Sequence, residues 1–197
     1  MNREQALTYI DTYLKGLQAS YLSDENLPLF RESIKLIRVK SKDTLIMPGE
    51  ICKHLYLVIE GGFVCRYIHE KTGLPNTINF YLTDLHPIMA TVDSFFTQTP
   101  THCELMAVRS SLVGALPLNV LNTLVERDEH FKQIYNNVLK TVMVEENELK
   151  TKLISYSSKE KYDFLLNEMP SVIQQVPSKY IAEFCGISPG WLSKLKK

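Results

Sequence analysis

The sequence has 197 residues, of which 45% are hydrophobic and 22% are charged, a composition typical of a folded globular protein. Its 22 lysine and arginine residues balance 22 aspartate and glutamate residues, so any affinity for nucleic acid must come from a local basic patch. The N-terminus lacks an apolar signal segment and no apolar run could span a membrane, so we expect a cytoplasmic protein without membrane contact.

Cysteine and histidine spacing gives no sign of a metal site. The histidines show no H-x-H or H-x-D spacing, and His86 and His102 are too far apart in sequence to indicate a metal site by themselves. Without a metal cluster or a nucleophile beside a base, we predict no enzyme activity. The scattered cysteines contain no C-x-x-C pair and are typical of reduced, buried thiols. They are Cys52, Cys65, Cys103 and Cys185.

The first half of the chain is rich in short strands. Apolar side chains at helical spacing predict a helix over residues 3–19, and the polar run 23–26 offers N-caps for a second helix that ends near residue 34. Runs rich in Val, Ile, Leu and Tyr follow, and turn-forming residues separate them. Many short strands at regular spacing predict a sandwich or a barrel-like roll. The predicted strands cover residues 36–40, 44–47, 54–59, 63–68, 77–81 and 104–116.

A long helix follows the strands. After a short helix over residues 119–126, residues 128–155 contain no glycine or proline, and a helix of about 27 residues spans roughly 40 Å. We favour pairing of this helix with that of a second copy of the chain, and packing on the chain's own roll is the alternative. An apolar stripe close to a heptad repeat supports the pairing. Its residues are Phe131, Tyr135, Val138, Val142, Leu149 and Leu153.

The C-terminal residues have the spacing of a helix-turn-helix. A helix over residues 157–169 precedes them, with a short linker through residue 177. Two amphipathic segments then meet at Gly186, which can adopt the left-handed turn conformation. The small Ala182 lets the helices cross closely, and Ser188, followed by a proline, is a favoured N-cap for the second helix. The predicted small core consists of Ile181, Cys185, Ile187, Leu192 and Leu195.

The second of these helices is a candidate for reading DNA. Lysine and serine side chains would contact phosphates, and Trp191 would contact a thymine methyl group or cover the small core. Four of the last twenty residues are lysines, opposed only by Glu183. The candidate DNA-binding residues are Lys179, Ser188, Trp191, Ser193, Lys194, Lys196 and Lys197.

Four segments, in this order, carry a resemblance to a known family. They are Pro48-Gly49-Glu50 with the strand that follows it, residues 95–100, residues 176–182 and residues 186–189. Together with the order of roll, long helix and helix-turn-helix, they resemble the CRP/FNR family of bacterial transcription regulators, and specifically the branch common in Bacteroidetes.

The resemblance implies an α+β fold with three parts. Residues 1–127 would form a sensory domain, a cyclic-nucleotide-binding-like jelly roll (double-stranded β-helix) with N-terminal helices. Residues 128–156 would form the dimerisation helix, and residues 157–197 the helix-turn-helix DNA-binding domain. The implied function is that of a homodimer that binds a palindromic operator in double-stranded DNA, with RNA polymerase as a further partner.

The effector site departs from the family pattern. The family holds the cyclic AMP ribose with a Gly-Glu pair and its phosphate with an Arg followed by a small hydroxyl residue. Here Pro87-Ile88 and Thr101-His102 occupy those places, so a buried phosphate would lack its arginine. We therefore expect no cyclic AMP and no cofactor, but either another small molecule or a pocket filled by side chains. The candidate pocket residues are Tyr81, Met89, Thr91, Ser94, Phe96, Thr101 and His102.

The recognition helix departs too. Gly190 and Lys194 stand where this branch often has an acidic residue and an arginine, the side chains that read cytosine and guanine. We therefore expect weaker or less specific DNA binding than is usual in the family. The alternative is a roll that binds a ligand or a partner, with a helix-turn-helix that no longer reads an operator.

Overall fold

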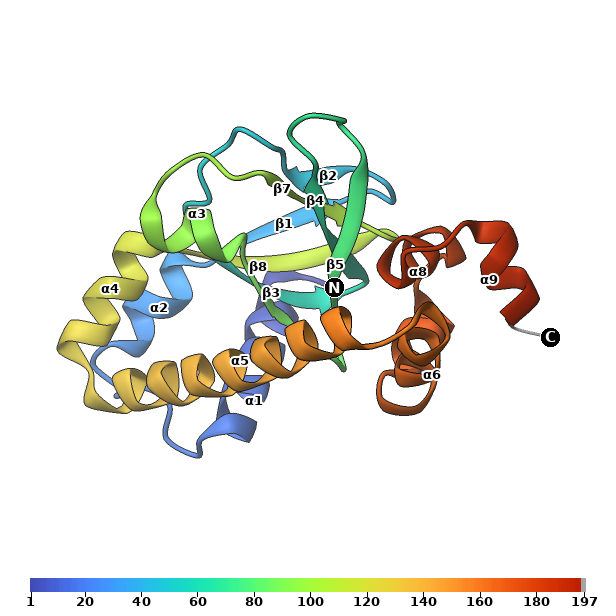
Figure 1. Ribbon diagram of the computed structural model, residues 1–197. Coiled ribbons are helices and arrows are strands. Elements are labelled where there is room, and N and C mark those ends of the chain that lie inside the picture. Colours follow the sequence, from blue (N-terminus) through green and yellow to red (C-terminus); the bar gives the residue numbers. More distant parts are fainter. Residues whose placement is uncertain (196–197) are drawn as a thin grey trace.

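Eight strands form two four-stranded sheets in the computed structural model, which describes residues 1–195 (Figure 1). The strand orders are β1-β8-β3-β6 and β2-β7-β4-β5, and every pairing is antiparallel. The predicted roll is thus confirmed, and its sheets are antiparallel. The strands are β1 (Lys35–Val39), β2 (Thr44–Ile46), β3 (His54–Glu60), β4 (Gly62–Ile68), β5 (Pro75–Leu82), β6 (Ile88–Met89), β7 (Cys103–Ala107) and β8 (Ser111–Pro117).

The strand predicted over residues 104–116 is wrong as a single element, because it is two strands in different sheets. The chain turns at Arg109, whose carbonyl accepts a hydrogen bond of 2.8 Å from the Ser111 hydroxyl. The same hydroxyl accepts a hydrogen bond of 3.0 Å from the Gly62 amide at the β3–β4 turn. In that turn Gly61 has a φ of 91°, which glycine adopts at low cost. Strand β6 has only two residues, too few for a recognisable pattern.

Nine helices occur within residues 1–195. The predicted helices at 119–126, 128–155 and 157–169 are confirmed, whereas α3 was not predicted and α7 occupies the segment expected to be a linker. Pro170 begins α7 as well as ending α6, because proline fits the first turn of a helix. The helices are α1 (Arg3–Leu17), α2 (Leu27–Ser33), α3 (Val92–Thr97), α4 (Leu118–Arg127), α5 (Glu129–Ser155), α6 (Ser158–Glu168), α7 (Pro170–Gln175), α8 (Ser178–Cys185) and α9 (Pro189–Leu195).

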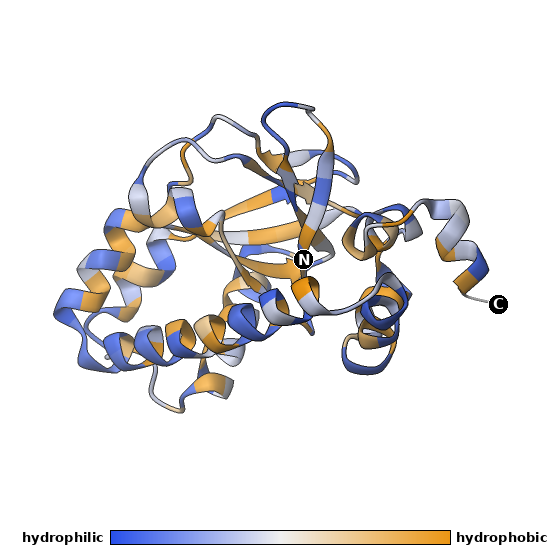
Figure 2. Ribbon diagram, in the orientation of Figure 1, coloured by the Kyte–Doolittle hydropathy of each residue, from blue (hydrophilic) through white to orange (hydrophobic). Residues whose placement is uncertain are grey.

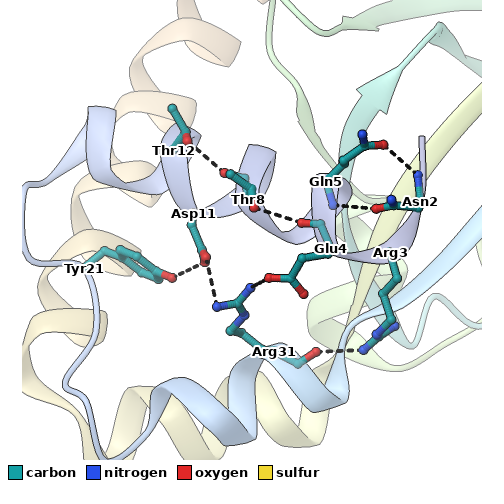
Figure 3. A network of polar contacts seen from close by, with 9 residues as sticks. All are labelled: Asn2, Arg3, Glu4, Gln5, Thr8, Asp11, Thr12, Tyr21 and Arg31. Atoms are coloured by element: carbon teal, nitrogen blue, oxygen red, sulfur yellow. Dashed lines mark hydrogen bonds and ion pairs between the residues drawn. The ribbon is translucent and has the colours of Figure 1, made fainter.

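A polar network joins α1 to the segment that leads into the roll (Figure 3). Arg3 donates to the carbonyl oxygens of Arg31 and Ile34 at 2.9 and 3.0 Å. Arg31 in turn pairs with Glu4 at 2.7 Å and with Asp11 at 3.7 Å. Helix α1 is therefore fixed on the roll by its buried apolar side and by charges at its edge.

Asp128 caps α5 and ties it to the N-terminal segment. Its carboxylate accepts hydrogen bonds from the Phe131 amide at 3.0 Å, the Ser23 amide at 2.9 Å and the Asn26 side chain at 3.0 Å, and also from the Ser23 hydroxyl. Burial raises the pKa of this carboxyl, but these hydrogen bonds outweigh that effect and hold the pKa well below its ordinary value. Ser23 and Asn26, expected as caps of α2, thus serve α5 instead.

Two groups of buried side chains hold the molecule together. The first lies between the sheets and includes α1, α2, α4 and the first turns of α5. The second lies on the outer face of the sheet β2-β7-β4-β5 and joins it to the end of α5 and to α6, α7, α8 and α9. The strands inside the roll are largely apolar, whereas α5 alternates between apolar and polar residues (Figure 2). The C-terminal helices therefore share a hydrophobic core with the roll.

The apolar stripe of α5 faces the chain's own roll and C-terminal helices. Phe131 is buried in the first core, with Tyr135 and Val138 packed against it. Leu149 belongs to the second core, with Leu153 packed against it, and Val142 lines a cavity between α5 and the roll. The stripe thus has the intramolecular role that the sequence left as the alternative, because the same spacing suits packing on a sheet and packing on a partner helix.

Candidate ligand cavity and helix-turn-helix

Helices α8 and α9 form the predicted helix-turn-helix. Gly186 has a φ of 69° and ends α8 in the left-handed conformation, and the Ile187 amide donates back to the Ala182 carbonyl at 3.0 Å. The Ser188 hydroxyl accepts from the Trp191 amide at 3.2 Å, so Ser188 is the N-cap of α9. Ile181, Cys185 and Leu192 are buried between the helices. The predicted turn, cap and small core are confirmed.

The candidate DNA-binding residues lie mostly on the outer side of α9, which projects away from the roll (Figure 1). Ser188, Ser193 and Lys194 are exposed, and Trp191 is 58% exposed, so Trp191 does not cover the small core. Lys179 lies on α8 with its ammonium 3.9 Å from Glu183. The remaining candidates, Lys196 and Lys197, lie outside the described residues.

An ion-pair cluster centred on Arg66 joins α8 to the roll. The guanidinium of Arg66, on β4, donates to both carboxylate oxygens of Glu183 at 3.0 and 3.1 Å and to Glu104 at 2.6 Å. The Thr77 hydroxyl also donates to Glu183, at 2.9 Å, and the ring of Tyr180 lies 5.4 Å from the guanidinium carbon. We call these five residues the Arg66 cluster. A two-pronged contact of this kind fixes the orientation of α8 on the sheet.

Apolar and polar contacts surround the Arg66 cluster. The rings of Phe80 on β5 and Phe184 on α8 have their centroids 5.1 Å apart. Helix α7 adds a hydrogen bond of 2.6 Å from Ser171 to Asp84. The sequence analysis noted Glu183 only as a charge that opposes the lysines, and nothing local in the sequence links it to Arg66.

A cavity of about 340 Å³ lies between the roll, α5 and α6. The roll contributes β5, β6 and α3, with Tyr81, Met89 and Phe96 among the lining residues. The opposite wall comes from α5, and Phe164 of α6 and Met169 close the end. Its volume lies within the range of about 300–1,000 Å³ that small-molecule sites occupy.

Several polar groups of the cavity wall are paired with one another. Glu145 lies 3.2 Å from His86 Nδ1, and Glu146 accepts a hydrogen bond of 2.6 Å from the Asn79 amide. Partial burial raises the pKa of Glu146 above its ordinary value, and the nearby His86 and the hydrogen bond from Asn79 oppose this effect. Lys152 pairs with Glu168 at 3.0 Å and lies 4.2 Å from the centre of the Phe164 ring.

Groups of metal-ligating side chains and membrane-spanning helices are both absent from the described part of the chain. Residues 1–195 contain no group of three or more histidine, cysteine, aspartate or glutamate side chains placed to hold a metal ion. No helix within these residues combines the length and apolar character of a membrane span.

Comparisons identify the fold. No family model and no curated protein matches the sequence, but solved structures match at a TM-score of 0.67. FixK2 from Bradyrhizobium japonicum is 11% identical over 83% of this chain and 82% of its own. A cyclic nucleotide-binding domain containing protein from Listeria monocytogenes is 14% identical over 95% and 88%. A protein of Eubacterium rectale assigned to the crp/fnr transcriptional regulators is 15% identical over 88% and 82%. The chain has the CRP/FNR fold.

Within this CRP/FNR fold the predicted pocket residues separate into two groups. Tyr81, Met89 and Phe96 line the cavity. The other four serve the structure around α3 and β7 or lie at the surface, so they are not among the lining residues. They are Thr91, Ser94, Thr101 and His102.

The hydrogen bonds of Ser94 and Thr101 explain the placement of these two residues. Ser94 is fully buried and accepts from the Cys52 amide at 2.9 Å, and Thr101 accepts from the Cys103 amide at 3.0 Å. His102 lies at the surface, 3.7 Å from Glu70. Sequence analysis missed the α5 wall, in which Glu145 and Glu146 interrupt the apolar stripe. That interruption was the one available signal.

Proposed function

We propose that this chain is a homodimeric, DNA-binding transcription regulator of the CRP/FNR type, and not an enzyme. The α8–Gly186–α9 unit carries the proposal, because it presents a capped second helix with exposed Ser193, Lys194 and Trp191 to solvent. The Eubacterium rectale structure of the same fold is assigned to the crp/fnr transcriptional regulators. The cytoplasmic location and the branch within the family stay predictions.

Selection of bound sequences from a random duplex library, at two salt concentrations, tests the proposal. A two-fold dimer should recover a palindrome with half-site centres about ten base pairs, or ~34 Å, apart. Recovery of duplexes without a common sequence, through contacts that are lost in salt, would favour the alternative of a roll whose helix-turn-helix does not read an operator. Gly190 and Lys194, which stand where base-reading side chains are expected, are the observation behind that alternative.

Lys194→Ala is expected to weaken DNA binding without changing the sequence preference, since its ammonium would contact a phosphate. Each lost phosphate contact makes the plot of log K against log salt less steep by about 0.9. A dimer, which would lose two contacts, should therefore show a slope that is less steep by about 2. Fluorescence anisotropy over a salt series measures the slope. Lys15→Ala, which removes an exposed lysine on α1, is the matched control and should leave it unchanged. An equal slope for both variants would show that Lys194 does not contact a DNA phosphate.

We propose that the dimer forms through solvent-exposed apolar side chains of α5 that lie outside the apolar stripe. Three apolar side chains on the outer surface of α5 are mostly exposed in the single chain: Met143 at 71%, Val144 at 58% and Ile154 at 80%. Met143 and Ile154 are eleven residues apart, about three helical turns, and so share one side of the helix. Burial of this side against its copy would leave the packing of the roll intact.

Met143→Glu with Ile154→Glu is expected to give a folded monomer, because charges would replace the apolar contact at exposed positions that belong to neither core, although Met143 also borders the cavity. Sedimentation velocity measures the oligomeric state and circular dichroism the fold. The control, Val138→Asp on the roll side, should instead lower the free energy of unfolding by about 2–3 kcal/mol, since it places a charge in the first core. A double glutamate variant that stays dimeric would place the interface on another surface.

A further inference from the structure

The α5 cavity offers a small molecule contacts with three parts of the protein at once. Its walls come from strands of the roll, from α5 and from α6, which leads into the helix-turn-helix. Most lining side chains are apolar, and several are aromatic, including Tyr81, Phe95 and Tyr135. Phe96, at 52% exposure, adds an aromatic ring that is open to solvent.

The charges of the cavity wall are mainly negative. The lining glutamates are Glu145, Glu146, Glu148 and Glu168. Lys152 is the one lysine or arginine among the lining residues of the described chain, and its ammonium is already paired with Glu168 at 3.0 Å and placed over a ring. An anionic ligand would therefore meet carboxylates without a free cation to balance its charge.

Arg66, on β4 of the roll, cannot supply the positive charge that an anionic ligand would need. Its guanidinium is bound to Glu104 and Glu183, and its side chain is only 7% exposed. A phosphate-containing ligand would need that kind of two-pronged donor. The same cavity suits a cation, because aromatic ring faces and carboxylates both attract an ammonium group.

Two carboxylates retain capacity for a ligand. Glu145 is held by His86 through Oε2, and Glu146 by Asn79 through Oε1. Each carboxylate offers about four acceptor positions. His86 has a backbone φ of 50°, a conformation that residues other than glycine rarely adopt. The wall at these residues is thus held in a particular shape.

We propose that the cavity binds a small amphipathic amine, with its ammonium group at Glu145 and Glu146 and its apolar part among the aromatic side chains. The role of this amine as the signal that alters DNA binding rests on the proposed function. Binding would connect the roll and α5 to α6, and so favour one placement of the C-terminal helices over others.

A matched series of probes tests the charge preference on the full chain without DNA. 4-Phenylbutylamine, 4-phenylbutanol and 4-phenylbutyrate share one skeleton and differ in charge. Probes of about eleven heavy atoms should bind with a Kd of about 1 mM or somewhat below. Isothermal titration calorimetry is expected to show the amine binding about tenfold more tightly than the alcohol, with the carboxylate weakest.

Three variants locate the site. Glu145→Gln with Glu146→Gln should remove the tenfold preference for the amine and leave the affinity for the alcohol unchanged. Phe96→Ala, at a half-exposed position where folding is not at risk, should weaken the amine and the alcohol alike. Glu126→Gln, an exposed position on α4, is the control and should change neither.

The proposal is overturned by any of four results. The first two are that none of the three probes binds, or that the carboxylate binds as tightly as the amine. The other two are that the preference for the amine over the alcohol survives the double glutamine change, or that Phe96→Ala leaves the affinities unchanged. Because no DNA is present, these results do not depend on operator binding. Likewise, a failed DNA selection beside a positive titration would remove the proposed function and leave the amine site.

Discussion

Arg66→Met is expected to lower the free energy of unfolding by about 3–5 kcal/mol, the usual cost of removing one partner from a buried ion pair. The substitution keeps most of the side-chain volume but leaves the carboxylates of Glu104 and Glu183, 15% and 16% exposed, without their cation. Urea denaturation followed by far-ultraviolet circular dichroism measures the change.

Few contacts would remain to compensate Glu183 for the lost guanidinium. Glu183 keeps only the Thr77 hydroxyl at 2.9 Å and the distant Lys179 ammonium at 3.9 Å. Adding Glu183→Gln to Arg66→Met should therefore recover part of the lost stability, because a neutral amide is less costly to bury than a carboxylate.

Arg31→Met is the matched control for the Arg66 prediction. Arg31 also pairs with two carboxylates, Glu4 and Asp11, but its side chain is 30% exposed and Glu4 is 77% exposed. Solvent screens such a pair, so the loss should be about 1 kcal/mol or less. Equal losses for the two arginines would show that the Arg66 cluster contributes no more than a surface pair.

Asp128→Ala is expected to lower the free energy of unfolding by about 3 kcal/mol at pH 7, because it removes the cap of α5 and takes the acceptor from one buried and two partly buried donors. The donors are the amides of Ser23 and Phe131 and the side chain of Asn26. Ser157→Ala, which removes the exposed cap of α6, is the control and should cost about 1 kcal/mol.

The Asp128 contribution should also depend on pH. The folded pKa lies below the ordinary value of 3.8, so the unfolded chain takes up the proton first as the pH falls. The contribution is thus fully present above about pH 4 or 5 and is lost as the pH falls from there towards the folded pKa. Urea titrations between pH 7 and pH 3 should show the difference between wild type and Asp128→Ala narrowing. A constant difference would assign the effect to packing.

Local signals in the sequence were sufficient for many, but not all, of the helices and strands. Gly186 with Ser188 marked the turn and cap of the helix-turn-helix, because the conformations that they adopt depend on neighbouring residues only. The turn between the strands predicted over residues 54–59 and 63–68 was found for the same reason. The break at Arg109 within an otherwise apolar run was too short to separate β7 from β8.

Long-range pairings escaped sequence analysis for a physical reason. Arg66 and Glu183 are 117 positions apart, and no periodicity links a strand residue to a helix residue across that distance. The apolar stripe of α5 was visible, but spacing does not distinguish a partner helix from the roll. Thr101 and His102 were chosen by family position, whereas the cavity depends on where α5 and α6 lie.

The second hydrophobic core limits which segments of this chain could be replaced by those of proteins with the same fold. Val64 and Phe80 of the roll are packed in one cluster with Ile181 and Phe184 of the helix-turn-helix. A hybrid in which the helices after α5 came from another protein would leave the outer face of the sheet β2-β7-β4-β5 uncovered. An exposed apolar face of this kind promotes aggregation. Such a graft would have to include the sheet surface along with the helices, because the roll and the C-terminal helices share one hydrophobic core.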